Sequence, residues 1–256
     1  MLLVTKQSLL SYLNNFTMSI IKHIPNTITC LNLFSGCVAS VMAVEGQFFL
    51  AALFVLLAAV FDFLDGMVAR LLHAYSNIGK ELDSLADVIS FGLAPGMVLF
   101  FWLNEIAGNE FLPYVAFLIP VFSALRLAKF NVDERQTTSF IGLPTPANAI
   151  FFVSLIAVMD PSVPMPGWVN LSFLSAIVGN KWVVVALILL FSYLLVCELP
   201  MFSLKFKNLS WQDNQPRFVL IAFAVLLLIA FQLLAFPFII LLFILMSLFF
   251  SFKKSA

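Results

Sequence analysis

The sequence predicts an all-α integral membrane protein: a polytopic helical bundle of about eight transmembrane helices, preceded by an N-terminal interfacial helix. Composition is the first reason, because 62% of the 256 residues are hydrophobic and only 10% are charged, whereas soluble domains are nearer half apolar and a quarter charged. The second is a mean hydropathy of +1.08. The third is a series of apolar runs close to the roughly 20 residues that a bilayer span needs. The net charge of zero provides no basic surface for nucleic acid.

The N-terminal segment, residues 1–22, does not resemble a cleavable signal peptide, because polar residues and lysines interrupt its apolar residues. Its mixed pattern predicts a helix lying in the membrane interface. A partly ordered tail is an equal alternative.

Eight apolar stretches follow and define the expected spans. They cover residues 27–44, 48–72, 82–103, 111–130, 144–159, 182–198, 218–234 and 237–252. A proline-rich loop at 160–167 separates the fifth span from the sixth. Only residues 235 and 236 separate the last two spans, and Pro237 begins the second of them, which predicts a tight helical hairpin.

Basic residues indicate the orientation. With eight spans, every Lys and Arg except Lys181 falls on the side that carries both termini. Positively charged loops are typical of the cytoplasmic side, so that side is predicted to be cytoplasmic.

Four aspartates interrupt the apolar pattern at the cytoplasmic ends of the second and third spans. Asp62 and Asp65 are three residues apart, and Asp83 and Asp87 are four apart, so each pair lies on one helix face. A short turn joins the two helices and is expected to bring the four carboxylates together. Carboxylates are costly in a membrane and usually mark an ion or substrate site.

Small and basic residues accompany the aspartates. Gly66 and Ala69 share the helix face of Asp62 and leave room for a bulky group to approach the backbone. Arg70 and Lys80 are near enough to meet a phosphate. The pattern therefore indicates a phosphate-bearing substrate.

Four carboxylates close together require neutralisation, and a pair of divalent cations would supply it. Oxygen-only ligands favour magnesium or manganese, and a two-metal site suits phosphoryl displacement. Two alternatives remain: the aspartates cap helices or pair with neighbouring basic residues, or the protein transports divalent cations.

These positions resemble the signature of the CDP-alcohol phosphatidyltransferases. Every signature position is filled: Asp62, Asp65, Gly66, Ala69, Arg70, Gly79, Asp83 and Asp87. In that family an alcohol hydroxyl attacks the β-phosphate of a CDP-linked lipid and releases CMP. The resemblance, which covers about residues 24–150 with the further stretches described below, implies a catalytic core at 23–160. The residue pattern predicts an interfacial segment at 1–22 before it and transmembrane helices at 161–256 after it.

The resemblance also implies roles for individual residues. Asp62, Asp65 and Asp83 would ligate two metal ions, magnesium or manganese, while Asp87 would act as general base and also touch a metal. The residues implied to contact the CDP-lipid are Asn26, Thr29, Gly66, Ala69, Arg70 and Ser76. For Asn26 the alternative is an ordinary helix N-cap.

Three further stretches, 81–95, 125–132 and 140–149, resemble integral-membrane phosphatidylserine synthases. This resemblance implies that CDP-diacylglycerol and L-serine give phosphatidylserine and CMP. It also implies a homodimer in a bacterial-type inner membrane, with the active site facing the cytoplasm. The alternative is a sister enzyme whose acceptor is glycerol 3-phosphate or inositol phosphate.

Arg126 and Lys129 are the expected acceptor-binding residues. They stand three apart at the cytoplasmic end of the fourth span, so one could pair with the serine carboxylate and the other with a lipid phosphate. Asp133 or Glu134 could face the serine ammonium. The alternative for both basic residues is the ordinary positive flank of a membrane span.

Overall fold

The computed structural model is an α-helical bundle and describes residues 2–108, 111–133, 140–163, 165–202 and 210–255. The chain begins with α1 (Leu2–Val44), α2 (Phe48–Leu71) and α3 (Asn77–Asp87). The remaining elements are η1 (Val88–Leu93), α4 (Ala94–Ala107), η2 (Leu112–Phe117), α5 (Leu118–Val132), β1 (Phe140–Ile141), α6 (Thr145–Ala157), α7 (Leu171–Val178), α8 (Lys181–Val196), β2 (Pro200–Met201), α9 (Trp211–Phe231), η3 (Gln232–Leu234) and α10 (Ala235–Ser255).

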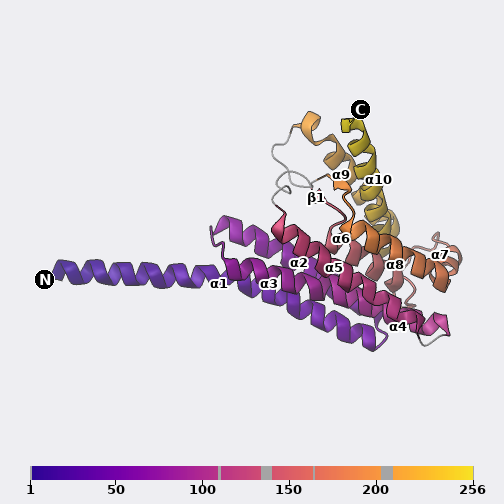
Figure 1. Ribbon diagram of the computed structural model, residues 1–256, viewed down its shortest axis with the longest axis horizontal. Helices are drawn as coiled ribbons and strands as arrows, with labels where there is room; N and C mark the ends of the chain where they lie inside the picture. The colour runs from indigo at the N-terminus through magenta and orange to yellow at the C-terminus, as the bar shows by residue number, and fades with distance from the viewer. Residues whose placement is uncertain (1, 109–110, 134–139, 164, 203–209, 256) are drawn as a thin grey trace.

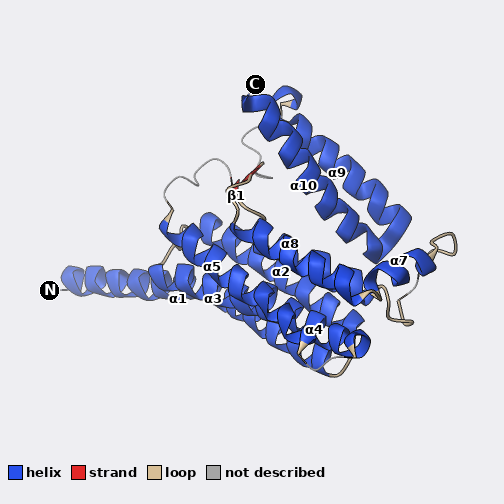
Figure 2. Cartoon of the chain, turned by 45° about the vertical axis from the view of Figure 1, so that its right-hand side comes forward, coloured by secondary structure: helices blue, strands red, loops and turns tan. Residues whose placement is uncertain are grey.

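The described residues contain five segments long and apolar enough to cross a membrane, or six if the bent pair α7–α8 is one span. The chain is therefore a multi-pass membrane protein, but the predicted count of about eight is not confirmed. One difference is α6, whose 13 residues extend only about 20 Å and fall short of the roughly 30 Å hydrocarbon core. The other is the stretch Asn214–Phe250, which counts as one apolar segment although α9 and α10 lie side by side as a hairpin (Figures 1 and 2).

Helix α1 is longer than the first span requires. It runs without a break from Leu2 and includes Pro25 in its interior, and its N-terminal half projects beyond the bundle (Figure 1). Residues 2–22 are thus helical and continuous with the span, while their predicted position in the membrane interface stays a prediction. Asn26 is inside this helix and so is not an N-cap.

The third helical segment is continuous but changes pitch. Helix α3 passes directly into η1, a π-helical stretch, and then into α4. The insertion of a π-turn shifts the faces of the helix on either side, and such turns are frequent at functional sites. Here it follows immediately after Asp87.

Two helices approach each other closely at this π-turn. The Ser90 hydroxyl donates a hydrogen bond to the Asn32 carbonyl of α1 at 2.9 Å. A Cβ atom at Gly36 would lie 2.6 Å from the Ser90 Cα, so only glycine lets α1 and η1 pack at this distance. The close packing fixes α1 against the helix that carries Asp87.

The C-terminal part of the chain is tied to the bundle by backbone pairing. Strands β1 and β2 pair antiparallel, with Phe140 opposite Met201, and the Leu143 amide donates to the Leu194 carbonyl at 2.8 Å. Gly142 has φ +77°, and a Cβ there would lie 3.2 Å from the Cys197 carbonyl oxygen. The end of α8 is therefore held beside the segment that enters α6.

We expect Gly36→Ala to destabilise the protein, because the added methyl group collides with the Ser90 Cα atom as well as with the Ser90 side chain, so rotation of that side chain alone cannot relieve the clash. Overpacking of this kind costs about 1–3 kcal/mol. Thermal unfolding in detergent should show a Tm several degrees below that of the wild type. Gly66→Ala is the matched control, since a Cβ at Gly66 meets nothing within 4 Å; equal Tm values for the two variants would contradict the expectation.

Candidate functional site

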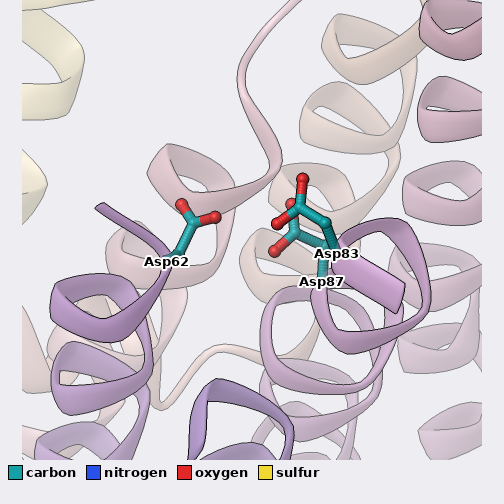
Figure 3. A group of neighbouring side chains, drawn as sticks. All are labelled: Asp62, Asp83 and Asp87. Carbon is teal, nitrogen blue, oxygen red and sulfur yellow. The ribbon is translucent and has the colours of Figure 1, made fainter. Parts of the chain in front are cut away.

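Three carboxylates from two helices converge at one point in the bundle. Asp62 on α2 faces Asp83 and Asp87 on α3 (Figure 3), and one oxygen from each lies within 4.8 Å of the others. Asp87 is buried, while Asp62 and Asp83 are half-buried. The structure thus brings together three of the four aspartates that the sequence singles out.

Asp65 lies outside this tight group. It is buried on α2, and its carboxylate interacts electrostatically with Asp62, Asp83 and Asp87. The Thr29 side chain of α1 is its neighbour, although the Thr29 hydroxyl also donates to the Pro25 carbonyl at 3.1 Å. Asp65 therefore belongs to the same acidic region but lies at its edge.

The start of α3 is set by local interactions that place Asp83 and Asp87. Ser76 is the N-cap, and its hydroxyl accepts a hydrogen bond from the Gly79 amide at 2.9 Å. A Cβ at Gly79 would lie 2.8 Å from Asn26 Oδ1. Ser76 and Asn26, both predicted to contact the CDP-lipid, thus also secure the approach of α3 to α1.

Asp87 is surrounded by polar groups that reach it from other helices. Asn32 of α1 donates to Asp87 Oδ1 at 3.4 Å, and the Arg126 guanidinium on α5 interacts electrostatically with it. Asn32 is fully buried and was not singled out from the sequence. The feature of the sequence that could have indicated Asn32 is its polar amide side chain within a mostly apolar span.

The residues present fit a hard divalent cation. Asp65 Oδ2 and Asp83 Oδ1 are buried acceptors without a hydrogen-bond donor. The carboxylates of Asp62, Asp83 and Asp87 repel one another at the spacing observed. Bound cations would satisfy these oxygens and offset the repulsion. All the donors are carboxylate oxygens, which suits magnesium or manganese better than zinc.

The surface beside the acids is open at Gly66. A Cβ at this position would meet no atom within 4 Å, so packing within the chain does not require glycine there. Ala69 is half-exposed and Arg70 is exposed at the end of the same helix. The arrangement leaves space for a ligand to approach the α2 backbone at Gly66, and the positively charged Arg70 follows one helical turn later.

A small pocket lies beside Arg126. Arg126 and Lys129, the predicted acceptor residues, both line it. Arg126 is buried, with its Nε atom lacking a hydrogen-bond partner, whereas Lys129 is exposed. Because Arg126 also interacts with Asp87, it connects this pocket with the acidic cluster.

A second set of polar contacts holds α3 against the end of α5. Lys80 Nζ donates to the Asn131 carbonyl at 3.2 Å, and Asn131 Nδ2 donates to Ser84 Oγ at 2.8 Å. Lys80, expected to meet a phosphate, thus takes part in packing. Glu134 lies outside the described residues.

Comparisons with known proteins identify a family to which this chain is similar in sequence. The CDP-alcohol phosphatidyltransferase family model matches residues 22–193, about two thirds of the chain, and that family is generally dependent on divalent cations. A CDP-diacylglycerol–serine O-phosphatidyltransferase of Helicobacter pylori is 37% identical over 60% of this chain and 65% of its own length. A Bacillus subtilis protein of the same name is 35% identical over 59% of this chain and 85% of its own.

An archaetidylserine synthase of Methanothermobacter thermautotrophicus is 36% identical over 50% of this chain and 54% of its own length. The matched region thus spans between about half and most of the length of these relatives. The family match covers the acidic cluster, the open face at Gly66 and the pocket residue Arg126. The chain belongs to the CDP-alcohol phosphatidyltransferase family.

Proposed function

We propose that this protein transfers the phosphatidyl group of CDP-diacylglycerol to the hydroxyl of L-serine, giving phosphatidylserine and CMP. The observation that carries the proposal is the position of Arg126, which lies beside Asp87 and lines the adjoining pocket. Three relatives whose names specify serine transfer or a serine-containing lipid support the choice of acceptor.

The pairing of Arg126 with Asp87 suits a short acceptor. In serine only two carbon atoms separate the hydroxyl from the carboxylate carbon. A serine whose carboxylate binds Arg126 can therefore present its hydroxyl close to Asp87. Acceptors with a long reach between anion and hydroxyl fit this spacing less well.

Asp87 is the proposed general base. It takes the proton of the serine hydroxyl as the oxygen bonds to the β-phosphorus of the CDP-lipid, and the bond from that phosphorus to the CMP oxygen breaks. Asn32 holds one Asp87 oxygen at 3.4 Å, which orients the carboxylate. A positioned base of this kind contributes about 10²–10⁴-fold to the rate.

Asp62, Asp83 and Asp87, with Asp65 at the edge, would hold the divalent cations, proposed to be two. When bound, such cations neutralise charge on the transferring phosphate and on its attacking and leaving oxygens. Magnesium and manganese are both compatible with the oxygen ligands.

The open face of α2 is the proposed binding surface for the CDP moiety. Gly66 and Ala69 provide clearance, and Arg70 supplies a cation for a phosphate. Asn26, Thr29 and Ser76 border this region from α1 and the start of α3. The diacylglycerol tails would extend between helices into the bilayer.

The proposed orientation has the acidic cluster facing the cytoplasm. Arg70, Lys80 and Lys129 lie at the end of the bundle that carries the cluster, and Lys181 is bound to the Ala107 carbonyl at the end of α4. Basic residues favour the cytoplasmic side. A bacterial-type inner membrane and a homodimer are proposed from the family resemblance.

The acceptor is tested by CMP release from purified protein with CDP-diacylglycerol and a divalent cation. We expect release with L-serine and at least about tenfold less with glycerol 3-phosphate or inositol phosphate, because these carry a bulky dianionic phosphate. Excess chelator should abolish release, and added magnesium or manganese should restore it. Release with glycerol 3-phosphate but not with serine would refute the proposed acceptor, and cation transport without CMP release would favour a transporter.

Asp87→Asn tests the base. We expect CMP release to fall by at least about 100-fold, since the amide cannot accept the proton, while CDP-lipid binding persists. Binding can be measured by the rise in Tm on addition of CDP-diacylglycerol. Near-wild-type turnover in this variant would rule out the assigned role.

Gly66→Ala tests the CDP-binding face. The Tm should stay at or above the wild-type value, because alanine favours a helix by up to about 1 kcal/mol over glycine and nothing lies within 4 Å. The KM for CDP-diacylglycerol should rise at least about tenfold, since the methyl group occupies ligand space. Unchanged KM in a folded variant would place the CDP moiety elsewhere.

A further inference from the structure

We infer that Glu198, together with Asp133, forms the subsite that recognises the α-ammonium group of the acceptor and so selects a free amino acid over other alcohols. This inference rests on the proposed function, because it concerns the acceptor of that reaction. Its basis is the composition of the pocket beside Arg126, which joins residues from α5 with residues from the end of α8.

The pocket contains charges of both signs. Arg126 and Lys129 are its two cations, and Asp133 and Glu198 are its two carboxylates. The formal charge of these four side chains is therefore zero, which matches a zwitterion. A phosphorylated alcohol would meet the same two cations but would be repelled by the two carboxylates.

Arg126 and the two carboxylates differ in burial. Arg126 is the buried member, next to Asp87, so the acceptor carboxylate is expected at the inner end. Glu198 is exposed and Asp133 half-buried, which places them toward the outer end. A zwitterion bound between the two ends would have its ammonium near the acids.

The end of α8 adds a second favourable feature for a cation. Leu195 and Val196, in the last turn of the helix, line the same pocket. The C-terminus of a helix carries roughly −0.5 elementary charge from its aligned peptide dipoles. An ammonium group at this position is stabilised by the helix end as well as by Glu198.

Backbone contacts hold Glu198 in place. The Gly142 amide donates to the Leu199 carbonyl at 2.9 Å, and the Ile141–Pro200 pairing follows on the other side. The Cys197 amide donates a hydrogen bond to the Tyr193 carbonyl at 2.9 Å. Glu198 is thus a defined wall of the pocket, although it is 65 residues beyond Asp133 in the chain.

The central experiment compares acceptors in wild type and in Glu198→Gln, Asp133→Asn and the double variant. L-Serine is compared with 3-hydroxypropionate, which has the hydroxyl and carboxylate but no amine. We expect each variant to raise the KM for serine at least about tenfold, as for the loss of a charge-assisted hydrogen bond. The kcat and the KM for CDP-diacylglycerol should change less than about threefold, and the preference for serine over 3-hydroxypropionate should narrow.

Two controls make the result specific. Glu105→Gln removes a carboxylate at the exposed end of α4, outside the pocket, and should leave every constant at its wild-type value. Lys129→Gln should raise the KM for serine while keeping the preference for serine over 3-hydroxypropionate, because it removes a cation rather than an ammonium partner. KM values are independent of the folded fraction, so partial misfolding does not obscure the comparison.

A measurement on the wild type needs no variant. L-Alanine has both charges of serine but lacks the hydroxyl, so it should inhibit competitively against serine, whereas propionate should inhibit at least about tenfold more weakly. Equal inhibition by the two, or an unchanged serine KM in the double variant, would overturn the assignment of Glu198 and Asp133. Absence of serine-dependent CMP release by the wild type would instead overturn the proposed function, and this inference with it.

Discussion

Carboxylate repulsion inside an apolar bundle is the constraint on which the rest of this structure depends. Asp62, Asp83 and Asp87 have oxygens within 4.8 Å of one another, and ionised side chains are rare and costly within membrane helices. Two helices that carry these groups would separate unless other contacts held them together. The neighbouring packing of α1 and η1 supplies such contacts.

Helix α1 holds the helix that carries Asp83 and Asp87 in place through close contacts between the two backbones. Gly36 admits Ser90, and Gly79 admits Asn26 and Ser76, so the α3–η1 segment is held against α1 on both sides of the acids. By contrast, Gly66 has no such neighbour. Glycines that look alike in the sequence therefore serve two purposes: two allow helices to pack, and one leaves room beside the acidic cluster.

The acidic cluster could be predicted from the sequence because it depends on short-range geometry. The spacing of Asp62 and Asp65, and of Asp83 and Asp87, determines which residues share a helix face, and the short connection limits how far apart the two helices lie. The composition likewise sufficed to predict a membrane protein. The number of membrane spans could not be predicted in this way, because the 13-residue α6 and the bend between α7 and α8 depend on packing that hydropathy does not report.

Contacts between distant parts of the chain were beyond the reach of such reasoning. Asn32 meets Asp87 across 55 positions, and the π-turn after Asp87 has no simple sequence signal. Glu198 reaches the pocket only because β1 pairs with β2 and Gly142 packs on the end of α8. Local spacing thus predicts the groups proposed to handle phosphate, which must be adjacent. By contrast, Glu198 follows α8 and meets Asp133 at the end of α5 only in the folded chain, so its proposed part in selecting the acceptor could not be predicted from the sequence.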